Sequence, residues 1–404
     1  MTPEANQKLP AVRGVDITPF RDDEGELLFA VQDPSHIAPY VLSLTLPGYF
    51  VLTQLDGEST CRDVQMAFFQ QFGEMLSAEQ VENLVAALDE SFLLHNERFE
   101  EEYRAKQAAY ARREARDNRA HYPDGTRLRV LLEEIVEEGE AAAVGDLRGL
   151  IAPHLDYERG RPCYADAYAT LAQAPPAERY VILGTNHFGR SASVVATRKD
   201  YQTPLGRATT DREMIDRLES MLGQPLCEHE FDHAAEHSVE LQVHMVQAVQ
   251  PEHPFSIVPL LCPDPCGPTG TQPYDGRGPD LGDFADALAD LLARDDRRTV
   301  VIAGADLSHV GQRFGDEEPT TEEFLESVRG SDTYLLKLLE QRDEQGFLKT
   351  LAERGNPTRV CSAGCIYAAA RALPERPVRV LRYHQAVSRE TETHVTCAAA
   401  VIGE

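Results

Sequence analysis

Residues 299–309 read TVVIAGADLSH, and this stretch decides the fold class. Residues 299–305 form an apolar run of strand length, and the polar residues Asp306, Ser308 and His309 follow directly. A short apolar run with such a boundary is typical of a buried β-strand. Because sites in open α/β sheets lie at the carboxyl ends of strands, the stretch predicts both a core strand and a functional site beyond its end.

Strand-like runs alternate with helical segments through the whole region 127–404. Besides 299–305, the predicted strands are 148–153, 179–184, 255–261, 378–384 and 394–402. The predicted helices are 164–173, 211–221, 237–249, 281–293, 320–341 and 362–372. This alternation is typical of an α/β domain with a largely parallel or mixed sheet and helices on both faces.

Two further strands end in a histidine, which adds metal chemistry to the predicted site. His154 follows the run 148–153, and His187 comes shortly after the run 179–184. One such histidine is usually structural, but three strands that each deliver a histidine or aspartate at the same relative point predict a shared crevice. Cys361 precedes a predicted helix, whose N-terminus favours the thiolate that a metal needs. Two nitrogens and one sulfur suit iron, copper or zinc.

Neighbouring polar residues are candidates for supporting roles. Asp306 is a candidate fourth ligand or an acceptor that orients an imidazole, and His309 is a candidate general acid or base. His237, Glu240 and His244 share one face of a predicted helix. They form either a separate metal site or, as we favour, a group in which His237 and Glu240 line the same crevice while His244 packs elsewhere.

Composition favours two domains and excludes several classes of partner. The chain has 404 residues with 67 acidic and 39 basic side chains, a formal charge of −28. Two domains are expected at this length. The negative charge disfavours nucleic acid and anionic membranes, and no apolar run reaches the length of a membrane span. With no signal-like start and with scattered cysteines, we expect a cytoplasmic protein without disulfides.

Residues 1–98 are predicted to form a small separate α+β domain. Alternating leucines from Leu42 and the apolar run 49–52 indicate short strands, and residues 92–94 indicate a closing strand. Two helical segments lie between them, with Val64, Phe68, Phe72, Leu84 and Leu88 as their predicted core. This order is typical of a winged helix, and too few basic residues lie on its second helix for DNA binding. The charged segment 99–126 is predicted to be a solvated connecting helix.

The C-terminal region resembles the Memo family, whose bacterial members are often called AmmeMemoRadiSam system protein B. The motifs that carry the resemblance are APHLDYERG, LGTNHFG, TPLG, EHSVELQ, ADLSHVGQRFG and VCSAGC, spread over residues 145–404. The resemblance implies a fold similar to class III extradiol dioxygenases and one metal ion held by His154, His187 and Cys361. It also implies that Asp306, His309 and His237 border that ion. The chain departs from the family pattern at Leu155-Asp156 and at Ser362.

The segments LDGESTCRDV, FFQQFG and VENLVAALDESFLL, within residues 55–94, resemble the PqqD-like peptide-recognition modules. This resemblance implies a peptide or a radical enzyme as partner; the alternative is an accessory winged-helix domain that packs against the catalytic domain. Three functions therefore stay open: an iron or copper oxidoreductase, a metal carrier or peptide-binding scaffold without turnover, and a zinc-dependent hydrolase. Metal analysis combined with oxygen consumption would separate them.

Overall fold

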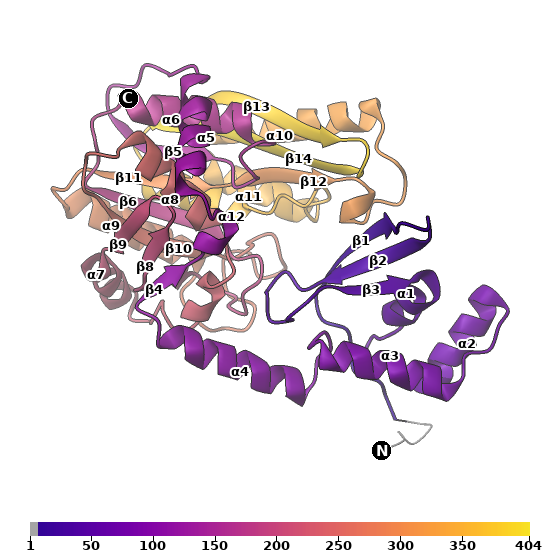
Figure 1. Ribbon diagram of the computed structural model, residues 1–404. Helices are drawn as coiled ribbons and strands as arrows, with labels where there is room; N and C mark the ends of the chain where they lie inside the picture. Colours follow the sequence, from indigo (N-terminus) through magenta and orange to yellow (C-terminus); the bar gives the residue numbers. More distant parts are fainter. Residues whose placement is uncertain (1–6) are drawn as a thin grey trace. The chain divides into compact units, whose positions relative to one another are not determined.

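The computed structural model describes residues 7–404 of the chain, which divides into two compact units, Met1–Arg112 and Arg113–Glu404 (Figure 1). Each unit has its own hydrophobic core. The division falls inside the segment 99–126 that the sequence predicts to be a connecting helix.

The N-terminal unit is a three-stranded antiparallel sheet followed by helices. The strands pair in the order β1 (Asp16–Arg21), β2 (Leu27–Gln32), β3 (Leu42–Thr45). The helices are α1 (Leu46–Thr53), α2 (Cys61–Phe72), α3 (Ala78–Glu90) and α4 (Glu97–Ala111). Of the predicted core, Val64, Phe68 and Leu88 are buried, and Phe72 and Leu84 pack partly buried against them.

Two predicted strands of this unit are wrong. Residues 49–52 lie in α1, because Thr45 caps the helix by accepting a hydrogen bond from the Gly48 amide and a proline occupies the first turn. The closing strand at residues 92–94 is replaced by a single bridge between Leu94 and Val12. The sheet therefore lies entirely before the four helices.

The prediction of one solvated helix over residues 99–126 is wrong beyond Ala111. The strand β4 (Ala115–Asp117) and the helix α5 (Gly125–Glu137) follow instead. Arg116 is only 2% exposed and pairs with Glu240 at 2.9 Å. The many charged residues of this segment indicated solvent exposure, but the charge of Arg116 is buried because Glu240 pairs with it inside the unit.

The C-terminal unit is built on an 11-stranded mixed sheet in which all six strands predicted from the sequence are present. Its parallel centre consists of β5 (Leu147–Ala152), β11 (Thr299–Gly304), β6 (Arg179–Thr185) and β10 (Ser256–Cys262). The antiparallel strands β12 (Asp306–Val310), β14 (Thr393–Gly403) and β13 (Val378–Ser388) extend it beyond β5. Beyond β10 lie β9 (Gly206–Thr210), β8 (Asp200–Thr203) and β4, and β7 (Val195–Ala196) pairs with β10.

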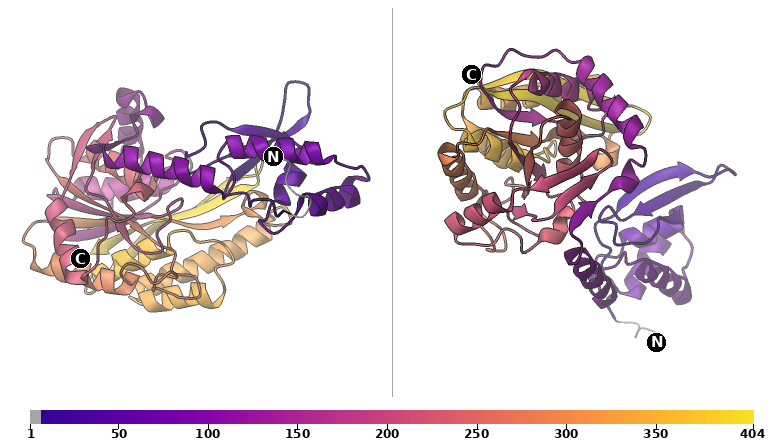
Figure 2. Two further views of the ribbon diagram at one scale, coloured as in Figure 1. Left: turned by 90° about the horizontal axis from the view of Figure 1, so that it is seen from below. Right: turned by 60° about the vertical axis from the view of Figure 1, so that its left-hand side comes forward.

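Helices cover both faces of this sheet (Figures 1 and 2). One face packs against α5, α6 (Arg161–Gln173) and α8 (Ser238–Val249). The other packs against α7 (Arg212–Leu222), α9 (Leu281–Arg294), α10 (Glu322–Glu340), α11 (Glu344–Glu353) and α12 (Ala363–Ala372). The predicted mixed α/β sheet between helices is therefore confirmed, and α11 is an addition to it. Within residues 7–404, every helix is too short or too polar to cross a membrane.

Candidate metal centre

The carboxyl ends of three neighbouring parallel strands bring the candidate ligands together. Strand β11 pairs with β5 on one side and with β6 on the other. His154 lies two residues beyond the end of β5, His187 lies two residues beyond β6, and Asp306 lies two residues beyond β11. The polar residues after these strands therefore meet at one edge of the sheet.

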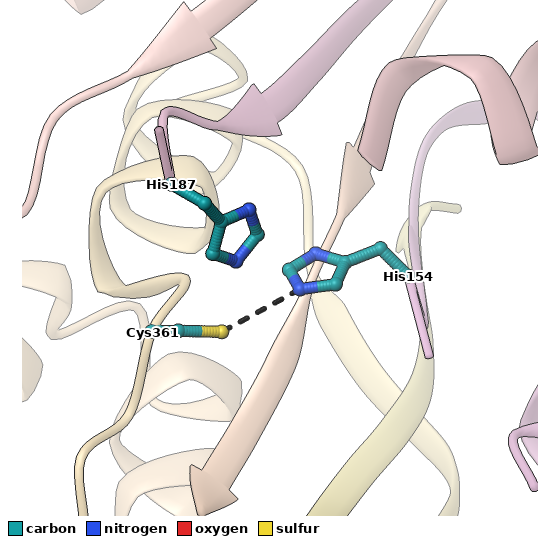
Figure 3. A group of neighbouring side chains, drawn as sticks. All are labelled: His154, His187 and Cys361. Carbon is teal, nitrogen blue, oxygen red and sulfur yellow. Dashed lines mark hydrogen bonds between the residues drawn. The ribbon is translucent and has the colours of Figure 1, made fainter. Parts of the chain in front are cut away.

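His154, His187 and Cys361 direct their side chains toward one another (Figure 3). The Sγ atom of Cys361 lies 3.6 Å from Nε2 of His154. Each of the three residues offers one ligand atom, and these atoms all lie within 4.8 Å of one another. Ligand bonds of about 2.0–2.3 Å would be reached by small side-chain movements from this arrangement.

The outer nitrogen of each imidazole is already bonded, which leaves the inner nitrogen available. Nδ1 of His154 donates to the Gly304 carbonyl at 2.9 Å. Nδ1 of His187 lies 3.0 Å from Oε2 of Glu236, which also accepts the His187 amide at 3.1 Å. An imidazole that donates through Nδ1 directs Nε2 toward the other ligand atoms, where Nε2 can bind a metal once it has lost its proton.

The site concentrates negative charge. Burial alone would raise the pKa of the Cys361 thiol, but the charges of His309 and His154 hold that pKa well below its usual value. Burial works against a charge on His154, yet the Asp306 carboxylate and the Cys361 sulfur raise its pKa to about 9. A thiolate and a carboxylate around buried imidazoles favour a cation at their centre.

The helix α8 approaches the strand ends closely enough to require glycine. A Cβ atom at Gly184 would lie 2.4 Å from Oγ of Ser238, and one at Gly304 would lie 2.6 Å from the Ser238 carbonyl. The Ser238 hydroxyl also accepts the Thr185 amide at 3.0 Å. This close contact places the start of α8, and with it Glu236 and His237, beside the candidate ligands.

Asp306 and His237 contact the candidate ligands directly, and His309 lies on the neighbouring strand β12. Oδ1 of Asp306 accepts the His154 amide at 3.1 Å, and Oδ2 lies 3.5 Å from Nε2 of His154. The His237 ring stacks on that of His187 at 5.5 Å and meets the edge of His154 at 5.6 Å. The His309 amide donates to the Thr358 carbonyl at 2.7 Å, which places β12 beside the segment that leads to Cys361.

Ser362, one of the departures from the family pattern, connects the three segments of the site. Its Oγ atom lies 3.2 Å from Sγ of Cys361 and 2.9 Å from Oγ1 of Thr185, and it accepts the Asp306 amide at 3.1 Å. Cys365 lies one turn along α12, fully buried, with its sulfur 3.4 Å from Oγ1 of Thr185. Its thiol is not one of the three converging ligand atoms.

The expectation that Glu240 lines the same crevice as His237 is wrong. Oε2 of Glu240 accepts hydrogen bonds from Arg116 at 2.9 Å and from Asn118 at 3.1 Å. His244 is fully buried, with Nδ1 3.1 Å from the Tyr157 hydroxyl and Nε2 3.7 Å from Glu240. These residues form a separate buried network, in which the Glu240 carboxylate is paired with the Arg116 guanidinium.

Glu236 is the residue of this site that the sequence analysis missed. It is 1% exposed, and its Oε1 atom accepts the amides of His237 and Ser238, both at 2.8 Å. The Glu236 carboxylate thus accepts from His187 with one oxygen and from the start of α8 with the other. The only local signal was an acid directly before His237 at a predicted helix start.

We expect Glu236→Gln to weaken metal binding by about 10- to 100-fold, the usual effect of losing a carboxylate that orients a ligating histidine. Glutamine has a single acceptor oxygen, so it cannot accept from His187 and from the His237 and Ser238 amides at once, and His187 loses its fixed orientation. Competition with a chromophoric chelator measures the change. Glu228→Gln, at an exposed position, is the matched control. Equal affinities for both variants would show that Glu236 does not orient His187.

The fold and the site together define an α/β protein with a His-His-Cys group at the strand ends of a mixed sheet. The family model described as Memo-like protein matches residues 113–401, and the chain belongs to the Memo family. A MEMO1 family protein of Aquifex aeolicus is 27% identical over 87% of this chain and 87% of its own length. The MEMO1 family protein TTHA0924 of Thermus thermophilus is 30% identical over 85% of this chain and 99% of its own length.

The matches to the two MEMO1 family proteins extend beyond the C-terminal unit. Residues 113–404 make up less than three quarters of the chain. A match over 85% of the chain therefore includes part of the N-terminal unit as well. Among solved structures, the uncharacterized protein JW3007 of Escherichia coli K12 has a TM-score of 0.38 at 14% identity, over 64% of this chain and 100% of its own; this likeness is too distant to support a conclusion.

Proposed function

We propose that the C-terminal unit holds one metal ion through Nε2 of His154, Nε2 of His187 and Sγ of Cys361. The observation that carries this proposal is the inward convergence of three ligand atoms while both outer imidazole nitrogens are already bonded. The mixed nitrogen and sulfur set fits iron or copper and also suits zinc. Three protein ligands leave a position open for a small molecule.

We further propose that the protein is a metal-dependent oxidoreductase of dioxygenase-like fold. Iron or copper would supply the redox chemistry when bound. The chain supplies the proton handling: Nδ1 of His309 lies 3.1 Å from the Leu307 carbonyl, so donation there leaves Nε2 as the base. Asp306 holds the His154 backbone, and His237 borders the same space.

The N-terminal unit supports a proposal about partners. We propose that it is a PqqD-like winged-helix module that recruits a peptide or a radical enzyme, as in an AmmeMemoRadiSam system. Its antiparallel sheet of β1, β2 and β3 offers the means to add an extended peptide as a further strand. Slower amide exchange in β1 or β3 of the full chain, with extended synthetic peptides present, is the expected result. Unchanged exchange across the peptide set would contradict it.

The free cysteines support a proposal about the compartment in which the protein acts. All eight cysteines are free thiols in the structure. Free, partly exposed thiols fit a reducing compartment, and we propose the cytoplasm.

Metal analysis combined with oxygen consumption tests the proposed function. We expect protein purified without an affinity tag to carry one iron or copper ion per chain and to take up oxygen in reducing buffer. One metal ion without oxygen uptake would contradict the oxidoreductase and favour a carrier or scaffold. Zinc together with hydrolytic turnover would favour a hydrolase.

A further inference from the structure

Arg116 lies in β4, the first strand of the C-terminal unit, and is one of the most buried side chains of that unit. Its strand, β4, is the outermost strand of the large sheet and pairs in parallel with β8, where Arg116 is opposite Tyr201. The guanidinium lies 4.8 Å from the centre of the Tyr201 ring. An arginine in this setting needs acceptors for its donors, and the structure provides them at one place.

The guanidinium holds both ends of the irregular link between the 3-10 helix Glu230–His233 and α8. Nε donates to the His233 carbonyl at 2.6 Å. Nη2 donates to the Glu236 carbonyl and, at 2.9 Å, to Oε2 of Glu240. Residues 234–237 are not helical, so these carbonyls depend on side-chain donors. One side chain thus determines the course of the link.

Glu236, at the end of this link, is the residue that orients His187. Its carbonyl is bonded to Arg116, while its carboxylate accepts both the amide and Nδ1 of His187. Two hydrogen bonds therefore connect Arg116 in β4 to the candidate ligand His187: one from Arg116 to Glu236 and one between Glu236 and His187. Lysine could not replace the arginine here, because it lacks the planar fork that reaches two carbonyls and a carboxylate at once.

We propose that Arg116 is a positioning residue for the metal centre: it fixes the link 234–237 so that the Glu236 carboxylate faces His187. The inference rests on the proposed metal site. Because β4 is the first element of the C-terminal unit, the metal centre depends on the strand with which that unit begins. A change in residues 113–118 is transmitted to His187 through Glu236.

Two variants and a control test this role in the full-length chain. Arg116→Lys keeps the charge but loses the fork. The pair Arg116→Met with Glu240→Met removes both buried charges, which protects the fold where a single loss would leave an unpaired charge. Arg119→Lys is the control, because the Arg119 side chain is exposed and pairs with Asp117 at 2.7 Å.

Two readouts separate positioning from simple stability. Cobalt(II) affinity, measured by chelator competition, is expected to fall by about tenfold or more in both Arg116 variants and to stay unchanged in the control. In the metal-free protein, the His187 amide, which is bonded to Glu236, is expected to exchange faster in the same variants. The thermal midpoint alone would respond to a merely structural role, whereas local exchange at His187 would not.

The outcomes distinguish this inference from the metal site itself. If the wild-type chain binds cobalt(II) but both Arg116 variants bind it equally well and protect the His187 amide equally, the positioning role is overturned and the metal site stands. A wild-type chain that binds no cobalt(II) would overturn the metal site, and this inference with it.

Discussion

Cys361→Ser is expected to lose most of the bound metal. A neutral hydroxyl replaces a soft thiolate that the surrounding histidines stabilise as an anion. Loss of a direct ligand should exceed the effect of losing an orienting partner, so we expect affinity to fall by more than about 100-fold. His154→Ala should have the same effect, because Nε2 of His154 lies 3.6 Å from Sγ of Cys361 in the same group.

Cys365→Ser is the matched control for this variant. Cys365 lies in α12, four residues after Cys361, and is fully buried with its sulfur 3.4 Å from Oγ1 of Thr185. Metal content, measured on untagged protein, should stay at the wild-type level in Cys365→Ser. If Cys361→Ser also kept its metal, the thiol would be a bystander and the case for a sulfur-bound redox centre would fail.

His309→Ala is expected to keep the metal but to lose oxygen uptake by about two to four orders of magnitude, as for a removed general acid or base. The structure supports this separation, because His309 lies outside the group of three converging ligand atoms. Its ring meets Phe314 edge-on at 5.1 Å, a contact that alanine would also remove, so the thermal midpoint should be recorded alongside activity.

The opposite pattern would change the assignment. If His309→Ala lost the metal while Cys361→Ser retained it, the ligands would be His154, His187 and His309. The open site would then be a three-histidine site, and zinc chemistry would become the better explanation.

Much of the C-terminal unit was predictable because its signals are local. The buried central strands are largely apolar, and β5, β6 and β11 are each followed by a polar site residue two positions beyond the strand end. The parallel pairing of β5, β11 and β6 then brings His154, His187 and Asp306 to one edge of the sheet. The convergence of these residues could be predicted from the positions of the strand ends, because sites in open α/β sheets lie at the carboxyl ends of strands.

The residues that the sequence analysis missed depend on contacts between distant segments. Glu236 is bonded to His187, 49 positions away, and Arg116 to Glu240, 124 positions away. A buried arginine looks like a surface arginine in a charged stretch, so composition indicated a solvated helix. The run 49–52 became helical because a cap at Thr45 and the following proline outweighed its apolar pattern.

X-ray absorption at the metal edge of the loaded, full-length chain tests the central claim most directly. The proposed centre predicts one sulfur neighbour at about 2.3 Å and imidazole nitrogens at about 2.0–2.1 Å, with the sulfur signal absent from Cys361→Ser. A wild-type spectrum with nitrogen and oxygen neighbours only, unchanged in Cys361→Ser, would contradict a metal ion held by His154, His187 and Cys361.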